Sequence, residues 1–338
     1  MEEALRIAVE RFVATAANAS SVNICSAKLL SGGAVQENWL IETQFVGGPF
    51  DGIMSLVLRC DSTTAGVAIS HNRAEEFALL KLVFNAGVTV PQPLWLCDDR
   101  TVIGRQFFIM RCIDGTAAGH LLARNAAYTS HRKGLAERLG KELARIHSIR
   151  PPHPELDFLP LTDETPAERR VKQYRAFLDS CPTAYPALEW GLRWLERHAP
   201  VQTTTTLCHG DYRTGNYMVN ENGLTGILDW EFAGWSDPME DIGWFCAKCW
   251  RFGNVAAEAG GIGDRADFYS GYENESKKLI DRISIKYWEV MAHVKWAVIA
   301  LQQADRQMSG EENSLLLALT GHIVPELEWE ILNLTEKD

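Results

Sequence analysis

The residue pattern of the sequence changes from strand-like to helical near residue 113, and this change limits the folds open to the chain. Before it, three apolar runs have the residue types of strands, and the turn-rich "VGGPFDG" separates the first two. The runs are "AKLLSGGAVQENWLIETQF", "GIMSLVLRC" and "RQFFIMRCI". Beyond Asp114-Gly115 the apolar residues recur at the spacing of amphipathic helices. We therefore expect an α+β chain with a small sheet followed by a mainly helical region.

One helix is expected inside the sheet region, where "HNRAEEFALLKLVFNAG" ends at Gly87, a typical residue after a helix C-terminus. The later helices are expected in "HRKGLAERLGKELARIH" and at about 165–178, 185–198, 283–308 and 314–334. The 338 residues exceed the size at which a single core stops growing. Two domains are therefore predicted, at residues 1–110 and 111–338.

Composition excludes several classes of protein. Hydrophobic residues at 46% and charged residues at 23% are typical of a globular protein, with neither a secretory signal nor a membrane-spanning run. We predict a cytoplasmic protein. The formal net charge of -11 argues against a nucleic-acid or anionic-membrane partner. The eight cysteines are expected to be reduced; Cys246 and Cys249 form a CxxC that is either core packing or a metal or redox pair.

Oxygen-bearing side chains gather in "LCHGDYRTGNYMVNENGLTGILDWE", residues 207 to 231. Asn222-Gly223 lies between two strand-like runs and predicts a hairpin. Such a hairpin, which follows the loop that contains Asp211 and Asn216, would return Asp229 to a place beside Asn216. An amide oxygen and a carboxylate suit magnesium, which binds few protein groups together with phosphate. Asp211 would then be free to accept a substrate proton.

The spacing of these residues is that of kinases, in which a loop Asp is followed five residues later by a metal-binding Asn and then by a metal-binding Asp at a strand end. Residues 210 to 245 hold seven acids and one basic residue, Arg213. This segment needs a metal ion before it can hold a triphosphate.

"HGDYRTGN" and "LDWEFAGWSDPMEDIGW" resemble the aminoglycoside phosphotransferase family of small-molecule kinases. Within that family, the chain is similar to bacterial phosphotransferases related to the kinase-like segment of some acyl-CoA dehydrogenases. The resemblance runs from about Lys28 to Asp241. It implies a protein-kinase-like two-lobed fold, with a small antiparallel-sheet N-terminal lobe for nucleotide and a mainly helical C-terminal lobe for the catalytic loop and the acceptor.

The resemblance also implies roles for single residues. Asp211 would be the catalytic base, Asn216 and Asp229 would bind magnesium, and Asp241 would brace the loop. His209 joins the catalytic set, either by orienting the loop or by transferring a proton.

The implied nucleotide site lies in the first lobe and has three parts. A phosphate-covering loop is expected at Ser31, Gly32 and Gly33, although Gly32-Gly33 also fits a plain hairpin turn. The basic residue of the next strand is Arg59, where a kinase normally has Lys, and its helix partner is Glu76 or, as the alternative, Glu75. The remaining nucleotide-site residues are expected at Met110, Arg111 and Cys112.

The function expected is transfer of the γ-phosphoryl group of ATP or GTP, with Mg²⁺, to a hydroxyl of a small molecule, by a monomer or homodimer. Two other classes stay open: an inactive nucleotide-binding regulatory relative and a metal-dependent hydrolase. A P-loop enzyme is disfavoured because no G-x-x-x-x-G-K-[ST] occurs. The acceptor stays open among aminoglycosides, choline-like alcohols, sugars and hydroxyacyl thioesters. Four tryptophans are expected either as core and cleft wall or as a cation-binding stack: Trp230, Trp235, Trp244 and Trp250.

Overall fold

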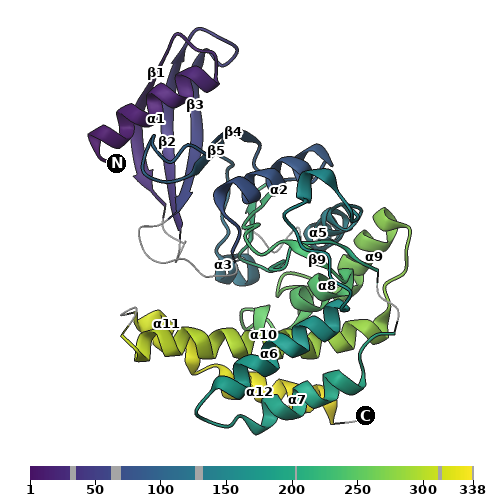
Figure 1. Cartoon of the computed structure of the whole chain (residues 1–338). Coiled ribbons are helices and arrows are strands. Elements are labelled where there is room, and N and C mark those ends of the chain that lie inside the picture. Colours follow the sequence, from purple (N-terminus) through teal and green to yellow (C-terminus); the bar gives the residue numbers. More distant parts are fainter. Residues whose placement is uncertain (31–35, 62–69, 126–131, 202–203, 311–313, 337–338) are drawn as a thin grey trace. The chain divides into compact units, whose positions relative to one another are not determined.

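The computed structural model describes residues 1–30, 36–61, 70–125, 132–201, 204–310 and 314–336 (Figure 1). Its chain forms two compact units, each assembled from several segments. Unit 1 contains Met1–Thr116, Pro152–Phe158 and Tyr217–Ala233. Unit 2 contains Ala117–Pro151, Leu159–Asn216 and Gly234–Asp338. The functional division into domains at residues 110 and 111 stays a prediction.

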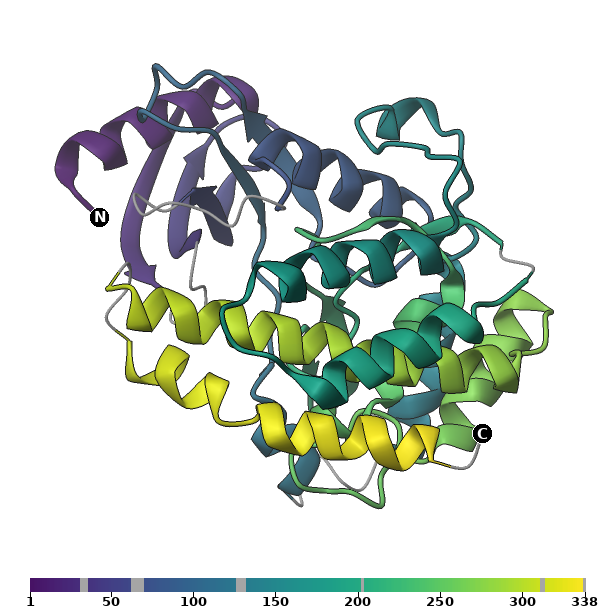
Figure 2. The same cartoon turned by 60° about the horizontal axis from the view of Figure 1, so that its bottom comes forward.

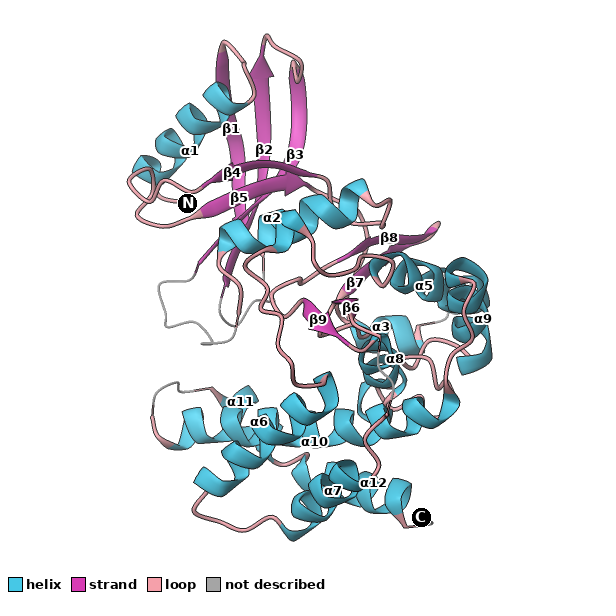
Figure 3. Ribbon diagram, turned by 45° about the vertical axis from the view of Figure 1, so that its right-hand side comes forward, coloured by secondary structure: helices cyan, strands magenta, loops and turns pink. Residues whose placement is uncertain are grey.

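Unit 1 is built on a five-stranded antiparallel sheet, drawn in magenta in Figure 3, with strand order β1-β2-β3-β5-β4. The strands are β1 (Ser21–Leu29), β2 (Gln36–Val46), β3 (Gly52–Asp61), β4 (Pro93–Cys97) and β5 (Phe107–Arg111). The expected turn between β2 and β3 is confirmed, and its Gly47 and Gly48 have positive φ. β3 is central in the sheet, and its buried run from Leu56 to Cys60 fits a strand covered on both faces.

Two helices belong to the sheet unit. Val9 and Val13 of α1 (Glu3–Ala16) are buried against sheet residues such as Phe45 and Leu56. The second helix, α2 (Arg73–Asn85), confirms the helix expected inside the sheet region, and Gly87 follows it with a φ of +79°. Strand β4 was not predicted. Its Pro93 would exclude a central strand, but β4 lies at the sheet edge, where proline is tolerated.

Unit 1 also contains the predicted hairpin, formed by β7 (Tyr217–Asn220) and β8 (Gly223–Ile227). The connecting residues are Glu221 and Asn222, and Gly223 pairs with Asn220 with a φ of +115°. The hairpin itself is confirmed, and its turn lies one residue earlier than the Asn-Gly pair indicated. β8 ends at Ile227, so Asp229 lies two residues beyond the strand, with a φ of +68°.

Unit 2 is mainly helical, as the apolar periodicity of the sequence predicted. Its longest helix, α10 (Arg282–Met308), packs beside several of the others, and Figure 2 shows it next to the teal α6 and the yellow α12. In the described part of unit 2, the other α-helices are α3 (Gly119–Arg124), α5 (Arg132–Ile146), α6 (Pro166–Ser180), α7 (Pro186–Arg197), α8 (Pro238–Cys246), α9 (Arg265–Ser276), α11 (Leu315–Gly321) and α12 (Val324–Thr335). Two short strands, β6 (Thr206–Cys208) and β9 (Gly234–Ser236), pair with each other.

The helix expected at 314–334 is wrong as a single element, because the chain forms α11 and α12 there with His322 and Ile323 between them. Pro325 is at the second position of α12. A proline has no N–H for an intrahelical bond and is tolerated in the first turn, so the sequence begins a new helix there. Across the described ranges, no helix is both long and apolar enough to cross a bilayer.

Helices α5 and α9 cross closely because glycines lie at the crossing. A Cβ at Gly140 would overlap the carbonyl oxygen of Phe268, and one at Gly271 would overlap that of Glu137. Both obstacles are backbone atoms, which cannot rotate away. Gly134, on the same helix α5, faces open space.

This difference predicts opposite effects of one substitution at two places on α5. Gly140→Ala should lower the free energy of unfolding of unit 2 by about 2 kcal/mol or more, because α5 and α9 must move apart. Gly134→Ala should raise it by up to about 1 kcal/mol through helix propensity. Urea unfolding of both variants measures this, and equal effects would contradict the close crossing.

Candidate active site

Asp211 lies in the loop of unit 2 between Cys208 and Tyr217, and its carboxylate is held by two donors from this loop and one from helix α8. The amide Nδ2 of Asn216 donates to Oδ2 at 2.6 Å, and the indole Nε1 of Trp244 donates to Oδ1 at 2.7 Å. Nε of Arg213 lies 3.1 Å from each oxygen. The Asp211 side chain keeps 13% of its surface exposed. The carboxylate is thus fixed in orientation and still reachable from outside.

The backbone of the same loop is held by Asp241 from helix α8. Its Oδ2 accepts the N–H of His209 at 2.6 Å, and its Oδ1 accepts the N–H of Gly210 at 2.9 Å. Burial would raise the pKa of Asp241, but the bond from His147 and these backbone bonds hold it below its ordinary value. The predicted brace role of Asp241 thus has a geometric basis in unit 2.

His209 lies inside this support. Its side chain is fully buried, and its Nδ1 accepts the N–H of Asp211 at 3.3 Å. Such a position suits a residue that orients the loop better than one that exchanges protons with a substrate. The role of His209 stays a prediction.

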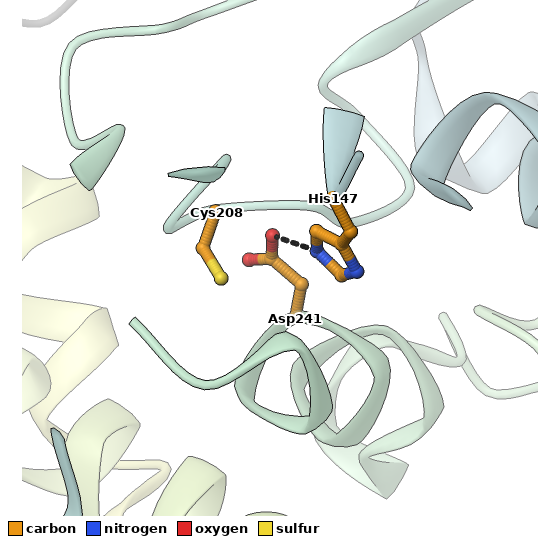
Figure 4. Close-up of side chains that lie close together, drawn as sticks. All are labelled: His147, Cys208 and Asp241. Carbon is orange, nitrogen blue, oxygen red and sulfur yellow. Dashed lines mark hydrogen bonds and ion pairs between the residues drawn. The ribbon is translucent and has the colours of Figure 1, made fainter. Parts of the chain in front are cut away.

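His147, Cys208 and Asp241 lie together beneath the loop, with potential metal-binding atoms within 4.8 Å of one another (Figure 4). His147 Nε2 is 3.2 Å from Asp241 Oδ2, and Cys208 Sγ is 3.4 Å from the carbonyl oxygen of Asp237. Burial raises the pKa of the Cys208 thiol well above its usual value, whereas a thiol binds metal as the thiolate. Both oxygens of Asp241 already accept backbone N–H groups. We therefore interpret this cluster as support for the loop.

In unit 1, Arg59 of β3 connects two predicted site residues. Its Nε and Nη2 lie 3.0 and 2.9 Å from the Glu76 carboxylate, and its Nη2 lies 3.0 Å from Asp229 Oδ1. Glu75 has a different task, because its carboxylate accepts the N–H of Asn72 in the capping box of α2. Of the two alternatives, Glu76 faces the strand.

The acids near Arg59 outnumber the cations that compensate them. Glu76 and Asp229 share Arg59, while Arg73 contacts both Glu76 and Asp61. Burial and the neighbouring charge of Asp229 together raise the pKa of Glu231 to about 7. This excess of negative charge beside Asp229 fits the binding of a divalent cation. Asn216 lies in unit 2, and its metal role stays a prediction.

Three of the remaining predicted nucleotide residues lie at the end of β5 or just after it. Met110 and Arg111 are the last residues of β5, and the Arg111 side chain donates to Gln92. Cys112 follows, and its N–H donates to the carbonyl oxygen of Ser55 at 3.0 Å. The expected phosphate-covering residues lie outside the described part of the chain: Ser31, Gly32 and Gly33.

Two contacts of the Asp211 loop were missed in the sequence. Trp244 was expected as core or cleft wall, and Lys295 of α10, whose Nζ lies 2.6 Å from the carbonyl oxygen of Gly210, was not singled out. No local pattern marks either residue, because the contacts arise from packing of α8 and α10 against the loop. Two tryptophans expected as possible cation-binding stacks are covered by the protein's own cations: Lys295 on Trp244 and Arg213 on Trp250.

Cys246 and Cys249 are free thiols that lie at the end of α8 and just after it. Burial raises the pKa of Cys246 to about 12 and that of Cys249 still further above its usual value. Both are thus kept as thiols, which favours core packing over metal or redox chemistry.

Residues 26–275 match the model of the family described as "Phosphotransferase enzyme family". The chain belongs to this family. Its phosphotransferase match covers both the sheet of unit 1 and the loop of unit 2, so the resemblance noted in the sequence is confirmed.

Individual relatives support the same assignment. The chain is 32% identical over 200 residues to mouse (Mus musculus) acyl-CoA dehydrogenase family member 10, an alignment that covers 56% of this chain and 18% of that protein. The aligned regions cover less than a third of each curated relative compared.

Solved structures show the fold of this phosphotransferase. A candidate aminoglycoside phosphotransferase from Ralstonia eutropha JMP134 has a TM-score of 0.78 at 20% identity, covering 98% of both chains. A spectinomycin phosphotransferase solved with ADP and spectinomycin has a TM-score of 0.65 at 14% identity, covering 96% of this chain and 97% of that one. The expected fold class is confirmed.

Because Glu76 pairs with Arg59 and Glu75 caps α2, we expect substitutions of these two acids to change the stability of unit 1 by different amounts. Glu76→Gln should leave Arg59 and Arg73 undercompensated and lower the free energy of unfolding of unit 1 by about 3 kcal/mol or more. Glu75→Gln should change it by less than about 0.5 kcal/mol, because glutamine also serves in a capping box. Hydrogen exchange of the α2 and β3 amides measures both. Equal protection in the two variants would contradict the assignment of Glu76 to Arg59.

Proposed function

We propose that this phosphotransferase is a small-molecule kinase that transfers the γ-phosphoryl group of ATP or GTP to a hydroxyl group. The observation that carries the proposal is the Asp211 carboxylate, held by Asn216, Arg213 and Trp244 in the loop that matches the family. A carboxylate fixed in this way can accept the hydroxyl proton as the phosphoryl group moves in line.

The metal roles are assigned to Asn216 and Asp229. Nδ2 of Asn216 donates a hydrogen bond to Asp211, so the amide oxygen of Asn216 is the group that would bind a metal. The excess of acids beside Asp229 in unit 1 supports its assignment. Bound magnesium would neutralise the charge of the phosphates. Because positioning and charge do most of the work in phosphoryl transfer, few protein groups are needed for the chemistry.

The nucleotide roles follow the same division. Arg59, oriented by Glu76, would bind the α and β phosphates, and Ser31, Gly32 and Gly33 stay the predicted phosphate-covering residues. Its planar guanidinium can contact phosphate with two parallel N–H groups, which a lysine cannot do. Met110, Arg111 and Cys112 would contribute to the nucleotide site from the end of β5. His209 would keep the Asp211 backbone in place.

The acceptor is a small hydroxylated molecule. A similar structure holds ADP and spectinomycin, and the curated relative carries an acyl-CoA dehydrogenase name. These comparisons keep aminoglycosides, choline-like alcohols, sugars and hydroxyacyl thioesters as classes to test. We keep as predictions a cytoplasmic monomer or homodimer without a nucleic-acid or membrane partner.

Asp211→Asn tests the proton acceptor. Asparagine keeps an oxygen for Trp244 but cannot take up a proton, so nucleotide affinity should be retained while transfer falls by about 10²–10⁴-fold. Magnesium-dependent ADP or GDP release with a panel of the four acceptor classes measures transfer, and calorimetry measures nucleotide binding.

The matched control is Asp179→Asn, an exposed acid on α6 that should leave both quantities unchanged. Near-normal turnover in Asp211→Asn would remove Asp211 from the mechanism. Hydrolysis that proceeds with magnesium but without nucleotide would favour the metal-dependent hydrolase instead.

A further inference from the structure

Helix α8 directs two side chains at the same loop. Asp241 and Trp244 are three residues apart and therefore lie on one face of the helix. Asp241 binds the loop backbone, and Trp244 binds its acid, since Nε1 donates to Asp211 Oδ1 at 2.7 Å. Trp244 is 3% exposed, so this bond is shielded from water. The backbone and the carboxylate of Asp211 are thus positioned from one rigid element.

The two oxygens of Asp211 have different neutral donors. Oδ1 accepts from Trp244 and Oδ2 accepts from Asn216. One donor on each oxygen fixes the plane of the carboxylate, which a single donor would leave free to turn about χ2. Arg213 lies 3.1 Å from both oxygens and adds charge without choosing between them. Trp244 therefore supplies an orientation that Arg213 does not.

Lys295 supports this bond from the face of the indole ring. Its Nζ lies 4.2 Å from the centroid of the Trp244 ring and donates to the carbonyl oxygen of Gly210 at 2.6 Å. Burial lowers the pKa of Lys295, an effect that the carboxylate of Glu240 opposes. A cation on the ring face draws electron density from the indole and makes its N–H a stronger donor. Lys295 thus tightens both the loop backbone and the bond to Asp211.

We propose that Trp244, backed by Lys295, is a positioning residue that orients the Asp211 carboxylate for proton acceptance. This inference rests on the proposed function. It assigns Trp244 no contact with nucleotide or acceptor, so its removal should affect the rate of transfer and leave nucleotide binding unchanged.

The aromatic cluster around Trp244 offers a matched control. The Trp250 centroid lies 5.1 Å from that of Trp244 and 4.8 Å from that of Trp296. Trp296 is partly buried in the same cluster, and it is Trp244 whose N–H reaches Asp211. If packing alone mattered, the same change at Trp244 and Trp296 would have similar effects.

The first experiment observes the hydrogen bond without needing turnover. In protein labelled with ¹⁵N-tryptophan, the indole N–H resonance of Trp244, identified by its loss in Trp244→Phe, is expected downfield of most others. In Asp211→Ala it should move upfield, because its acceptor is gone, whereas the Trp296 resonance should stay. An unmoved Trp244 resonance would overturn the inference.

The second experiment removes only the N–H. Replacing Trp244 by 3-benzothienylalanine keeps the shape and ring face of the indole, with sulfur in place of N–H. Magnesium-dependent ADP release from ATP, measured with the panel of four acceptor classes, should then fall about 10-fold or more in kcat, with the nucleotide KM unchanged. Lys295→Met should lower kcat by a smaller factor, and Trp296→Phe should match the original chain.

The outcomes separate the two proposals. A wild-type kcat with benzothienylalanine, or a raised nucleotide KM at unchanged kcat, would overturn the positioning role. In an Asp211→Asn background the benzothienyl change should cause no further loss, and an additive loss would overturn it too. Absence of turnover in the wild-type chain with both ATP and GTP would refute the proposed function, and the indole shift would still decide the inference.

Discussion

The loop that contains Asp211 is held by a buried carboxylate, that of Asp241. Its two oxygens accept consecutive backbone N–H groups, from His209 and Gly210, just before Asp211. Such charge-assisted bonds are among the stronger ones in proteins, and burial shields them from water. They fix the backbone just before Asp211, the proposed proton acceptor. The donors on the Asp211 side chain can act because the main chain beneath it is already immobile.

Charge follows a common principle in both units. Each predicted functional acid has a guanidinium beside it: Arg59 for Asp229 in unit 1 and Arg213 for Asp211 in unit 2. In unit 1 the acids outnumber the cations, because Arg59 and Arg73 together contact three carboxylates: Glu76, Asp229 and Asp61. A magnesium ion bound together with a nucleotide would supply the positive charge that these acids lack. The arrangement thus supports the proposed phosphoryl transfer.

The sequence predicted the elements that depend on residue types and spacing within one short segment. Asn222-Gly223 predicted the hairpin, and the apolar periodicity predicted α5, α6 and α7. The spacing of Asp211 and Asn216 predicted that both lie in one loop, and their side chains are hydrogen-bonded there.

Local sequence rules failed where the position of a segment in the tertiary structure determines its conformation or contacts. Edge placement permits Pro93 in β4, and a proline in its first turn starts α12 as a separate helix. The sequence left both Glu75 and Glu76 as partners for Arg59, and the structure separates them because Glu75 belongs to the capping box of α2. The bond from Trp244 to Asp211 joins residues 33 apart, which no local pattern indicates.

The proposed function requires a divalent ion held by Asn216 and Asp229 together with nucleotide. The most direct measurement is an anomalous-difference map from crystals grown with ADP and Mn²⁺. We expect a peak within coordination distance of the Asn216 amide oxygen and the Asp229 carboxylate, with the ADP phosphates also bound to the metal. A peak coordinated by other side chains, or ADP bound without metal at these two residues, would contradict the account.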